Sequence, residues 1–366
     1  MAHVFVAPHP DDVALSCGGL IASLRELGQN VTILTVFSGS GAAGQGNGSN
    51  GNTGLTTYQR EALGFGTKAL WPATEAFNRS SIRADFPAGP VDTEWAADDD
   101  RLEATQSDAD ASAKRFWQRA SWYRRASIRN KSLAGQAVMD DVSTQGAVYT
   151  DDVVDAATAG EIVAARRVED ERFAYFAEAS VVFLDLADAV FRGYEGDEQL
   201  LGGPRADDAA PFEILRREIA RLEPQKVYLP LGIGGHVDHQ LCREVGVRLL
   251  GESRRWVMPG PEYAGIVTFY EDFPYAWWHD FSAIHDLGPK ALADLPGNVG
   301  LTPDYADIGD QLERKITGIN LYESQIGNLF TSTREMARQV RAYAAKVGSL
   351  RGEGGVFERY WSTVPA

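Results

Sequence analysis

The 366-residue sequence predicts an α/β fold with a mostly parallel sheet covered by helices on both faces. Three observations predict it. Short apolar stretches typical of strands alternate with longer stretches typical of helices. Two of the apolar stretches lead directly into turns that carry histidine and aspartate, at the sheet edge where ligands bind in open α/β folds. A segment rich in glycine, serine and asparagine interrupts the alternation after the second strand, which indicates a long insertion.

The first 37 residues have a β-α-β pattern. His3–Ala7 is apolar and predicts a buried strand, and Asn30–Phe37 ("NVTILTVF") predicts the second strand. Ala14–Leu27 lies between them and predicts a helix, because its leucines recur at a spacing that gives one apolar face. These leucines are Leu15, Leu20, Leu24 and Leu27.

The alternation of helices and strands resumes after residue 155. The predicted elements are a helix over 156–178, a strand over 180–186, a helix over 212–222, a strand over 226–233, a helix over 238–250 and a strand over 265–271. A C-terminal region, 306–347, predicts amphipathic helices. Because strands that alternate with helices form parallel sheets, we assign residues 1–37 and 156–366 to one domain.

Residues 38–155 form the predicted insertion. Its first part, 38–54, reads "SGSGAAGQGNGSNGNTG" and predicts a flexible loop that cannot bury a core. The remainder contains aromatic residues and a basic, helix-like stretch over 114–131. We expect this remainder to be a packed lid or cap, with a partly disordered insertion as the alternative.

Composition restricts the class of protein. The hydrophobic content of 44% supports a sizeable core, and no apolar run reaches the roughly 18–20 residues that a membrane span needs. A cleaved signal peptide is not expected, and two cysteines do not make a disulfide framework, so we expect a cytoplasmic enzyme. The net charge of −16 opposes non-specific binding to nucleic acid. The oligomeric state stays open, with a homo-oligomer among the options.

Two motifs carry the chemistry. His9-Pro10-Asp11-Asp12 follows the first predicted strand, and "GIGGHVDHQ", with His236, Asp238 and His239, follows the strand over 226–233. Both lie at carboxyl ends of strands, so the two clusters can converge at one edge of the sheet. The alternative interpretation is that the aspartates cap a helix and the histidines are ordinary surface residues.

The residue types in these motifs fit a catalytic zinc site, which takes three protein ligands and keeps a position open for water. His9, Asp12 and His239 would supply the ligands. Asp11 would then face the bound water as a general base. His236 would stand across the site, with Asp238 available to orient or protonate it.

"PHPDD" together with "GHVDH" resembles the LmbE-like/PIG-L family of zinc-dependent N-acetylglucosaminyl deacetylases. Three further stretches are similar to that family: "RRVEDERFAYFAEASVVFLDLAD" (166–188), "FYEDFPYA" (269–276) and "KITGINLYESQI" (315–326). The resemblance covers about 1–37 and 160–330. It implies a Rossmann-like three-layer sandwich with the long insertion after the second strand.

The resemblance implies the same ligands and the same general base. It implies that His236, as imidazolium, stabilises the oxyanion or protonates the leaving amine, with Asp238 behind it. It also implies that Arg167 and Asp188 contact the sugar, although Arg167 would equally suit a solvated helix charge. The sequence departs from the family pattern at Val13 and Val237, which removes no ligand, and at the insertion 38–155.

The expected function is a zinc-dependent N-deacetylase acting on an N-acetylglucosamine unit of a larger molecule, such as a glycoconjugate. Ferrous iron, cobalt or nickel could occupy the same ligands. Two alternatives stay open. One is an amide hydrolase of the same fold with a non-sugar acylated metabolite as substrate, and the other is a non-catalytic carbohydrate-binding relative.

Overall fold

The structure is a computed structural model that describes residues 1–40, 156–194, 196–252, 265–279, 295–297, 299–352 and 354–365. All of these residues belong to one compact unit, Met1–Gln45 with Ala104–Ala366. The predicted loop beyond residue 40 and the predicted lid over 55–155 lie outside the described residues. Among the described helices, none is long and apolar enough to cross a membrane.

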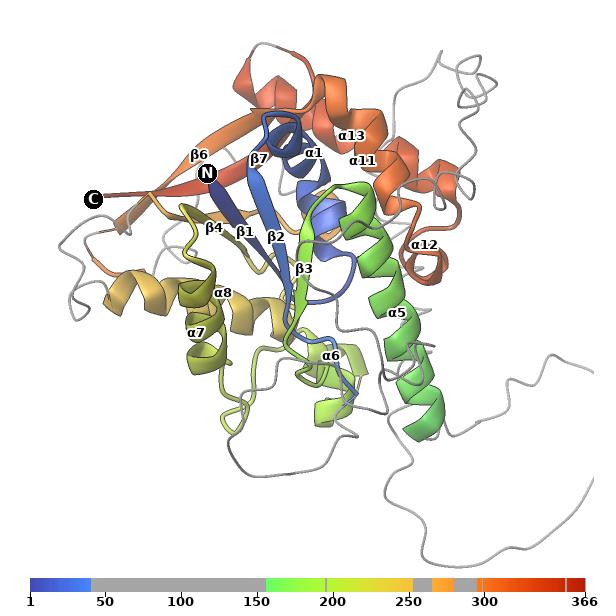
Figure 1. Ribbon diagram of the computed structural model, residues 1–366, viewed down its shortest axis with the longest axis vertical. Helices are drawn as coiled ribbons and strands as arrows, with labels where there is room; N and C mark the ends of the chain where they lie inside the picture. The colour runs from blue at the N-terminus through green and yellow to red at the C-terminus, as the bar shows by residue number, and fades with distance from the viewer. Residues whose placement is uncertain are drawn as a thin grey trace, which may run out of the picture. The chain divides into compact units, whose positions relative to one another are not determined.

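The core of the fold is a seven-stranded sheet with the order β3-β2-β1-β4-β5-β7-β6 (Figure 1). Its strands are β1 (Ala2–Ala7), β2 (Asn30–Thr35), β3 (Ser180–Phe183), β4 (Lys226–Pro230), β5 (Val267–Tyr270), β6 (Val299–Asp307) and β7 (Phe357–Pro365). The first five strands run parallel to one another. Strand β7 pairs antiparallel with both β5 and β6.

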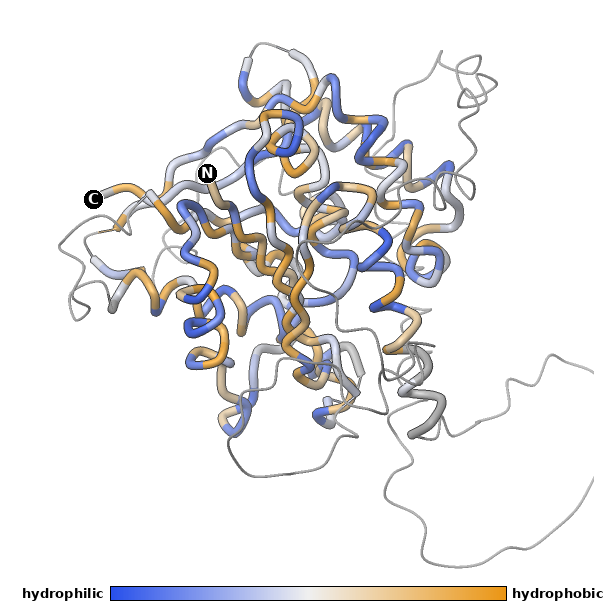
Figure 2. Tube along the Cα trace, in the orientation of Figure 1, coloured by the Kyte–Doolittle hydropathy of each residue, from blue (hydrophilic) through white to orange (hydrophobic). Residues whose placement is uncertain are grey.

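Strand β1 occupies the centre of the sheet. It pairs with β2 on one side and with β4 on the other, so that His3 lies opposite both Val31 and Lys226. Apart from Ala2, all its residues are buried, as expected for a parallel strand covered on both faces. Figure 2 shows the hydrophobic colour concentrated along these central strands.

Helices cover both faces of the sheet, which makes the three-layer arrangement (Figure 1). One layer packs α1, α5, α11 and α13 together and against the sheet, and the other contains α7 and α8. The helices are α1 (Asp12–Glu26), α5 (Ala156–Phe176), α6 (Gly196–Leu200), α7 (Phe212–Leu222), α8 (Val237–Glu252), α9 (Tyr275–Trp278), α11 (Leu312–Ile319), α12 (Glu323–Leu329) and α13 (Thr333–Arg351), with 3-10 turns η2 (Ala189–Arg192) and η5 (Gly309–Gln311).

A buried ion pair joins one helical layer to strand β7 of the sheet. Lys315 Nζ on α11 donates to Glu358 Oε1 on β7 over 2.7 Å, and both side chains are 5% exposed. The same carboxylate accepts the N–H groups of Gly19 and Leu20 in α1. A carboxylate with these partners would be left uncompensated if the lysine were removed.

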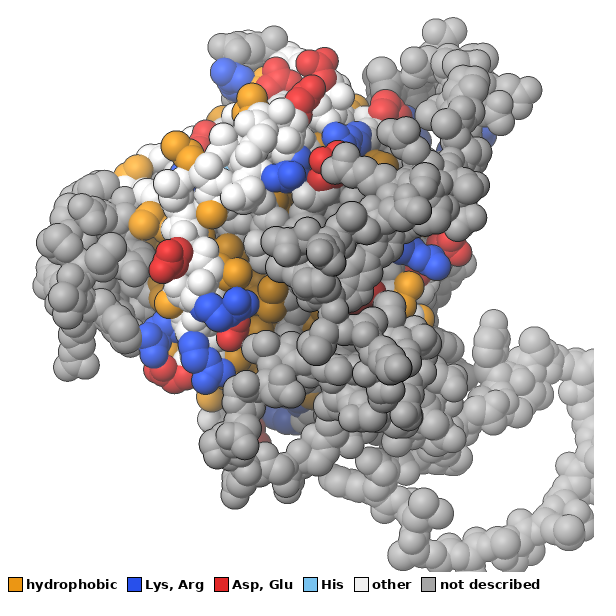
Figure 3. Space-filling view, viewed as in Figure 1, with side chains coloured by type: hydrophobic (Ala, Val, Ile, Leu, Met, Phe, Trp, Pro, Cys, Tyr) orange, Lys and Arg blue, Asp and Glu red, His pale blue; other side chains and the backbone are white. Residues whose placement is uncertain are grey.

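The predicted α/β fold with a mostly parallel sheet is confirmed. The main difference is the antiparallel pair β6 and β7, which the sequence analysis did not predict. Strand β4 also ends at Pro230, before the predicted residue 233, because the chain turns through glycines there. On the face shown in Figure 3, acidic side chains lie beside and between the basic ones among the described residues.

Candidate active site

The turn after β1 separates two adjacent carboxylates by its backbone conformation. Asp11 stands at the N-cap position of α1 with φ 101° and ψ −35°, and its side chain makes no capping hydrogen bond. A non-glycine residue at such an angle is strained, and strain of this kind is typical of functional sites. Asp12 is the first residue of the helix. The capping interpretation therefore does not account for the Asp11 side chain.

The turn after β4 brings the second motif to the same edge. Gly234 has φ 86°, and a Cβ atom at this position would come within 2.6 Å of the Tyr275 ring. Glycine is therefore required for the close turn that leads into α8. His236 and His239 lie just before and within the first turn of that helix, and the ring of His239 packs edge-on against Tyr275.

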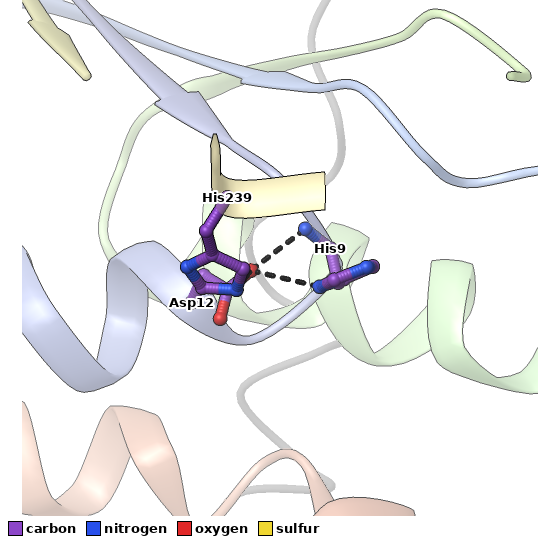
Figure 4. Close-up of side chains that lie close together, drawn as sticks. All are labelled: His9, Asp12 and His239. Carbon is purple, nitrogen blue, oxygen red and sulfur yellow. Dashed lines mark hydrogen bonds and ion pairs between the residues drawn. The ribbon is translucent and has the colours of Figure 1, made fainter. Parts of the chain in front are cut away.

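His9, Asp12 and His239 converge, as Figure 4 shows. Asp12 Oδ2 lies 3.2 Å from His9 Nδ1 and 3.4 Å from His239 Nε2. One ligand atom from each of the three residues lies within 4.8 Å of the others, and all three residues are buried. Burial raises the pKa of Asp12, but His239 and His9 outweigh it and lower that pKa to about 2. Two imidazoles and an ionised carboxylate are a donor set that suits a divalent transition metal.

The outward nitrogen of His9 is held by Asp238. Its Nε2 lies 2.8 Å from Asp238 Oδ2, which also accepts the N–H of Ala189, while Asp238 Oδ1 accepts from Arg192 Nη2 over 2.6 Å. His9, His236 and Asp238 also lie close enough to hold a metal. We favour the set with Asp12, because both oxygens of Asp238 already accept hydrogen bonds. A carboxylate behind a ligating histidine is the usual support in metal sites.

The outward nitrogen of His239 is held by Asp272, which the sequence analysis did not select. Asp272 Oδ1 lies 2.6 Å from His239 Nδ1. It follows β5, so it stands at the carboxyl end of the strand next to β4. The strand-end rule that identified the two motifs could have found it within "FYEDFPYA".

His236 lies beside the two histidines of the ligand set, with its ring centroid 5.0 Å from that of His9 and 5.5 Å from that of His239. Burial and the neighbouring His9 lower the pKa of His236 to about 3, which favours a neutral ring. Its Nδ1 accepts the backbone N–H of Asp238 over 3.2 Å, so the proton of the neutral ring stands on Nε2. The surroundings therefore favour a neutral donor where the sequence analysis expected an imidazolium, and the Asp238 carboxylate supports His9 instead of His236.

Arg166 is the cation that faces Asp11. Its Nη2 lies 3.6 Å from Asp11 Oδ1 and donates to the carbonyl of Pro10 over 3.2 Å, and its Nη1 lies 3.7 Å from Asp188 Oδ2. Burial and the charge of Asp12 raise the pKa of Asp11 to about 8, against the opposing effect of Arg166. A carboxyl group with such a pKa can take up and return a proton near neutral pH.

Arg167 and Asp188, the two predicted sugar contacts, lie in different surroundings. Arg167 pairs with Asp185, and its guanidinium stacks on the Phe183 ring at 4.2 Å. Successive residues of a helix point about 100° apart, and it is Arg166 whose guanidinium contacts Asp11 and Asp188, while that of Arg167 contacts Asp185. Asp188 does lie at the site, 3.7 Å from His9 Nε2.

A small hollow opens beside these groups. Asp188 and Arg166 supply its polar wall, and apolar residues supply most of the rest. It is lined by Pro10, Phe37, Ser38, Gly39, Val163, Arg166, Asp188 and Phe191. Pro10 of the first motif therefore borders this small hollow together with Arg166 and Asp188.

Comparison with known proteins relates the first motif of this site to a family of de-N-acetylases. The model of the PIG-L family, described as GlcNAc-PI de-N-acetylase, matches residues 4–100, which contain His9, Asp11 and Asp12. The resemblance to the LmbE-like/PIG-L family is confirmed. A 2'-N-acetylparomamine deacetylase of Streptomyces fradiae is 30% identical over 195 residues, which are 50% of this chain and 63% of that enzyme. The chain thus spans less than two thirds of the length of this relative.

Solved structures share the fold at lower identity. The deacetylase of the A40926 pseudoaglycone superposes with a TM-score of 0.51 at 19% identity, over 99% of this chain and 97% of that one. The zinc-inhibited form of a teicoplanin deacetylase gives a TM-score of 0.53 at 17% identity, over 100% of this chain and 99% of that one. At these identities the likeness shows the α/β fold alone.

Proposed function

We propose that this chain is a metal-dependent deacetylase that hydrolyses an N-acetyl group on an amino sugar carried by a larger molecule. The observation that carries the proposal is the ligand set of His9, Asp12 and His239 with the separate, strained carboxylate of Asp11 beside it. A site that only bound a metal would not need this additional carboxylate. The relative that deacetylates 2'-N-acetylparomamine supports an N-acetylated amino sugar as the substrate, and the solved structures that share the fold are deacetylases of the A40926 pseudoaglycone and of teicoplanin.

The residues fit a divalent metal ion, and we propose zinc. The inward atoms His9 Nδ1, Asp12 Oδ2 and His239 Nε2 face one another, and Asp238 and Asp272 hold the outward nitrogens. A zinc ion bound there would polarise the amide carbonyl and lower the pKa of a coordinated water to about 7. Other divalent transition metals suit the same donors.

Asp11 is the proposed general base. It removes a proton from the attacking water as the new C–O bond forms at the amide carbon. The carboxyl group then returns this proton to the nitrogen as the C–N bond breaks, so that acetate and a free amine leave. Its raised pKa suits both steps.

His236 is the proposed oxyanion donor. Its neutral ring presents Nε2–H, because Nδ1 is occupied by the backbone N–H of Asp238. A fixed donor at the oxyanion typically contributes several kcal/mol to the lowering of the barrier, and a neutral imidazole can supply it. Asp188 and Arg166, at the polar wall of the hollow, are the proposed contacts for sugar hydroxyls.

The test combines metal analysis with a substrate panel. We expect about one zinc per wild-type chain and release of acetate from N-acetylated amino sugars, with both lost in His239→Ala. If the chain hydrolyses acylated non-sugar amines and no N-acetylated amino sugar, the substrate class in this proposal is wrong. Sugar binding without hydrolysis under any added divalent metal would overturn the enzymatic function.

A further inference from the structure

Asp272 is a buried carboxylate that belongs to neither sequence motif. It is 1% exposed and follows the last residue of β5 by two positions. Its Oδ1 lies 2.6 Å from His239 Nδ1, and its Oδ2 accepts the backbone N–H of Ile233 over 3.0 Å. The carboxylate therefore bridges the turn after β4 and the histidine in the first turn of α8.

The residues on both sides of Asp272 are themselves held in place. Glu271 is 3% exposed and accepts hydrogen bonds from Arg359 and from Trp361 Nε1 of β7, as well as from Tyr343 on α13. The backbone N–H of Phe273 donates to Ser16 Oγ of α1 over 3.1 Å. The position of Asp272 is thus fixed from two helices and the sheet.

This contact decides which nitrogen His239 can offer to a metal. Asp272 accepts at Nδ1, so the neutral ring carries its proton there and leaves the lone pair of Nε2 directed at Asp12, 3.4 Å away. The arrangement at His9 is reversed, because Asp238 holds Nε2 and Nδ1 faces Asp12. The two histidines therefore present different nitrogens to the same space.

The two supporting carboxylates also differ in the cations beside them. Asp238 accepts from the guanidinium of Arg192, which offsets its charge. Among the described residues, Asp272 forms ion-pair contact only with His239. The negative charge of Asp272 is therefore available to strengthen His239 as a ligand.

We propose that Asp272 is a positioning residue that fixes the tautomer of His239 and thereby sets the affinity of the site for its metal ion. This inference rests on the metal site of the proposed function. It predicts that His239 binds the metal through Nε2. It also predicts that an amide at residue 272 weakens metal binding, because an amide can present its NH₂ group to Nδ1 and so move the histidine proton to Nε2.

The first experiment measures the zinc dissociation constant of the full-length chain by competition with a chromophoric chelator. We expect Asp272→Asn to bind zinc about 10–100-fold more weakly than wild type, the usual effect of losing such a partner. The matched control is Ser16→Ala, which removes the neighbouring hydrogen bond to Phe273 but keeps the carboxylate. An affinity within twofold of wild type in Asp272→Asn, or an equal loss in Ser16→Ala, would overturn the inference.

The second experiment needs no variant at residue 272 to fold. Long-range ¹H–¹⁵N spectra of the zinc-loaded wild type, labelled at histidine, report which ring nitrogen is protonated. The rings that bind zinc are identified in the wild type by the change of their ¹⁵N shifts when zinc is added. We expect one such ring protonated at Nε2, which is His9 held by Asp238, and one protonated at Nδ1, which is His239 held by Asp272. Two zinc-bound rings that are both protonated at Nε2 would overturn the inference.

These results separate the inference from the proposed function. A wild-type chain that binds zinc, with an unchanged affinity in Asp272→Asn, overturns the role of Asp272 alone. A wild-type chain that binds zinc and loses affinity in Asp272→Asn, but hydrolyses no N-acetyl amine, overturns the deacetylase function and supports the role of Asp272. A wild-type chain that binds no metal overturns both.

Discussion

Replacing Arg166 with glutamine is expected to move the acid limb of the pH profile of kcat/KM to higher pH. Arg166 Nη2 lies 3.6 Å from Asp11 Oδ1, and its positive charge favours the ionised form of that carboxyl group. A general base must be ionised to accept a proton, so activity rises as the pH passes its pKa. Without the guanidinium the pKa of Asp11 rises further, and a higher pH is needed for the same activity.

The size of the shift follows from the geometry. Two unit charges at 3.6 Å interact by about 5 kcal/mol at an effective dielectric constant of ~20, which corresponds to about 3 pKa units. Arg166 shares its charge with Asp188 at 3.7 Å, and its side chain is 12% exposed, so the full value is an upper limit. We expect the acid limb to move up by about one to two pH units.

The assay measures release of the free amine from an N-acetylated amino sugar between pH 5 and 10, with zinc held at saturation. The matched control is Arg167→Gln, the next residue along the helix, which pairs with Asp185 and stacks on Phe183. This control should leave the acid limb in place. An unmoved limb in Arg166→Gln, or an equal shift in Arg167→Gln, would refute the reasoning.

Three further substitutions test single contacts. Asp11→Asn should retain about one zinc per chain by elemental analysis but lose at least ~100-fold in kcat, and near-wild-type turnover would contradict the role of the base. Burial raises the pKa of Asp170 from 3.8 to about 6, so its stabilising effect is full below about pH 4 and is lost as the pH rises through 6. In urea titrations, the free energy of unfolding of the wild type should therefore fall by up to about 3 kcal/mol between pH 4 and pH 7, relative to that of Asp170→Asn. Free energies of unfolding that change in parallel with pH in the two proteins would exclude this effect. Lys315→Met leaves Glu358 without its cation and should lower the free energy of unfolding by about 3–5 kcal/mol. Arg341 is partly exposed and pairs with the exposed Glu313, so Arg341→Met should change the free energy of unfolding by less than about 1 kcal/mol. Equal losses in these two variants would contradict the prediction.

The parallel part of the fold was predictable because its signals are local. Hydrophobic stretches of five or six residues alternate with helices, and the helix over 212–222 has the predicted bounds. The antiparallel pair of β6 and β7 was missed because its register depends on pairing between distant segments. Strand β6 is also only partly buried, so its residues give a weak pattern of hydrophobicity.

The convergence of His9, Asp12 and His239 was predictable because two rare clusters of histidine and aspartate follow two strands. The residues beside them were less visible, because Asp272 and Arg166 lie in stretches that resemble the family but are not distinguished there from their charged neighbours, and their contacts depend on distances that only the fold sets. The choice of Arg167 over Arg166 shows this limit. A shift of one residue along a helix turns a side chain by about 100°, and the sequence pattern did not determine which arginine faces Asp11.

The pairing of β1 with β4 has a consequence for how the chain matures. His9 and His239 are separated by 229 intervening residues, and they meet only because these two strands lie side by side. A nascent or truncated chain that lacks β4 would hold His9 and Asp12 without their third partner. If the proposed zinc site is correct, high-affinity zinc binding should therefore appear only once β1 and β4 have paired, so that zinc binding would report that the centre of the sheet has folded.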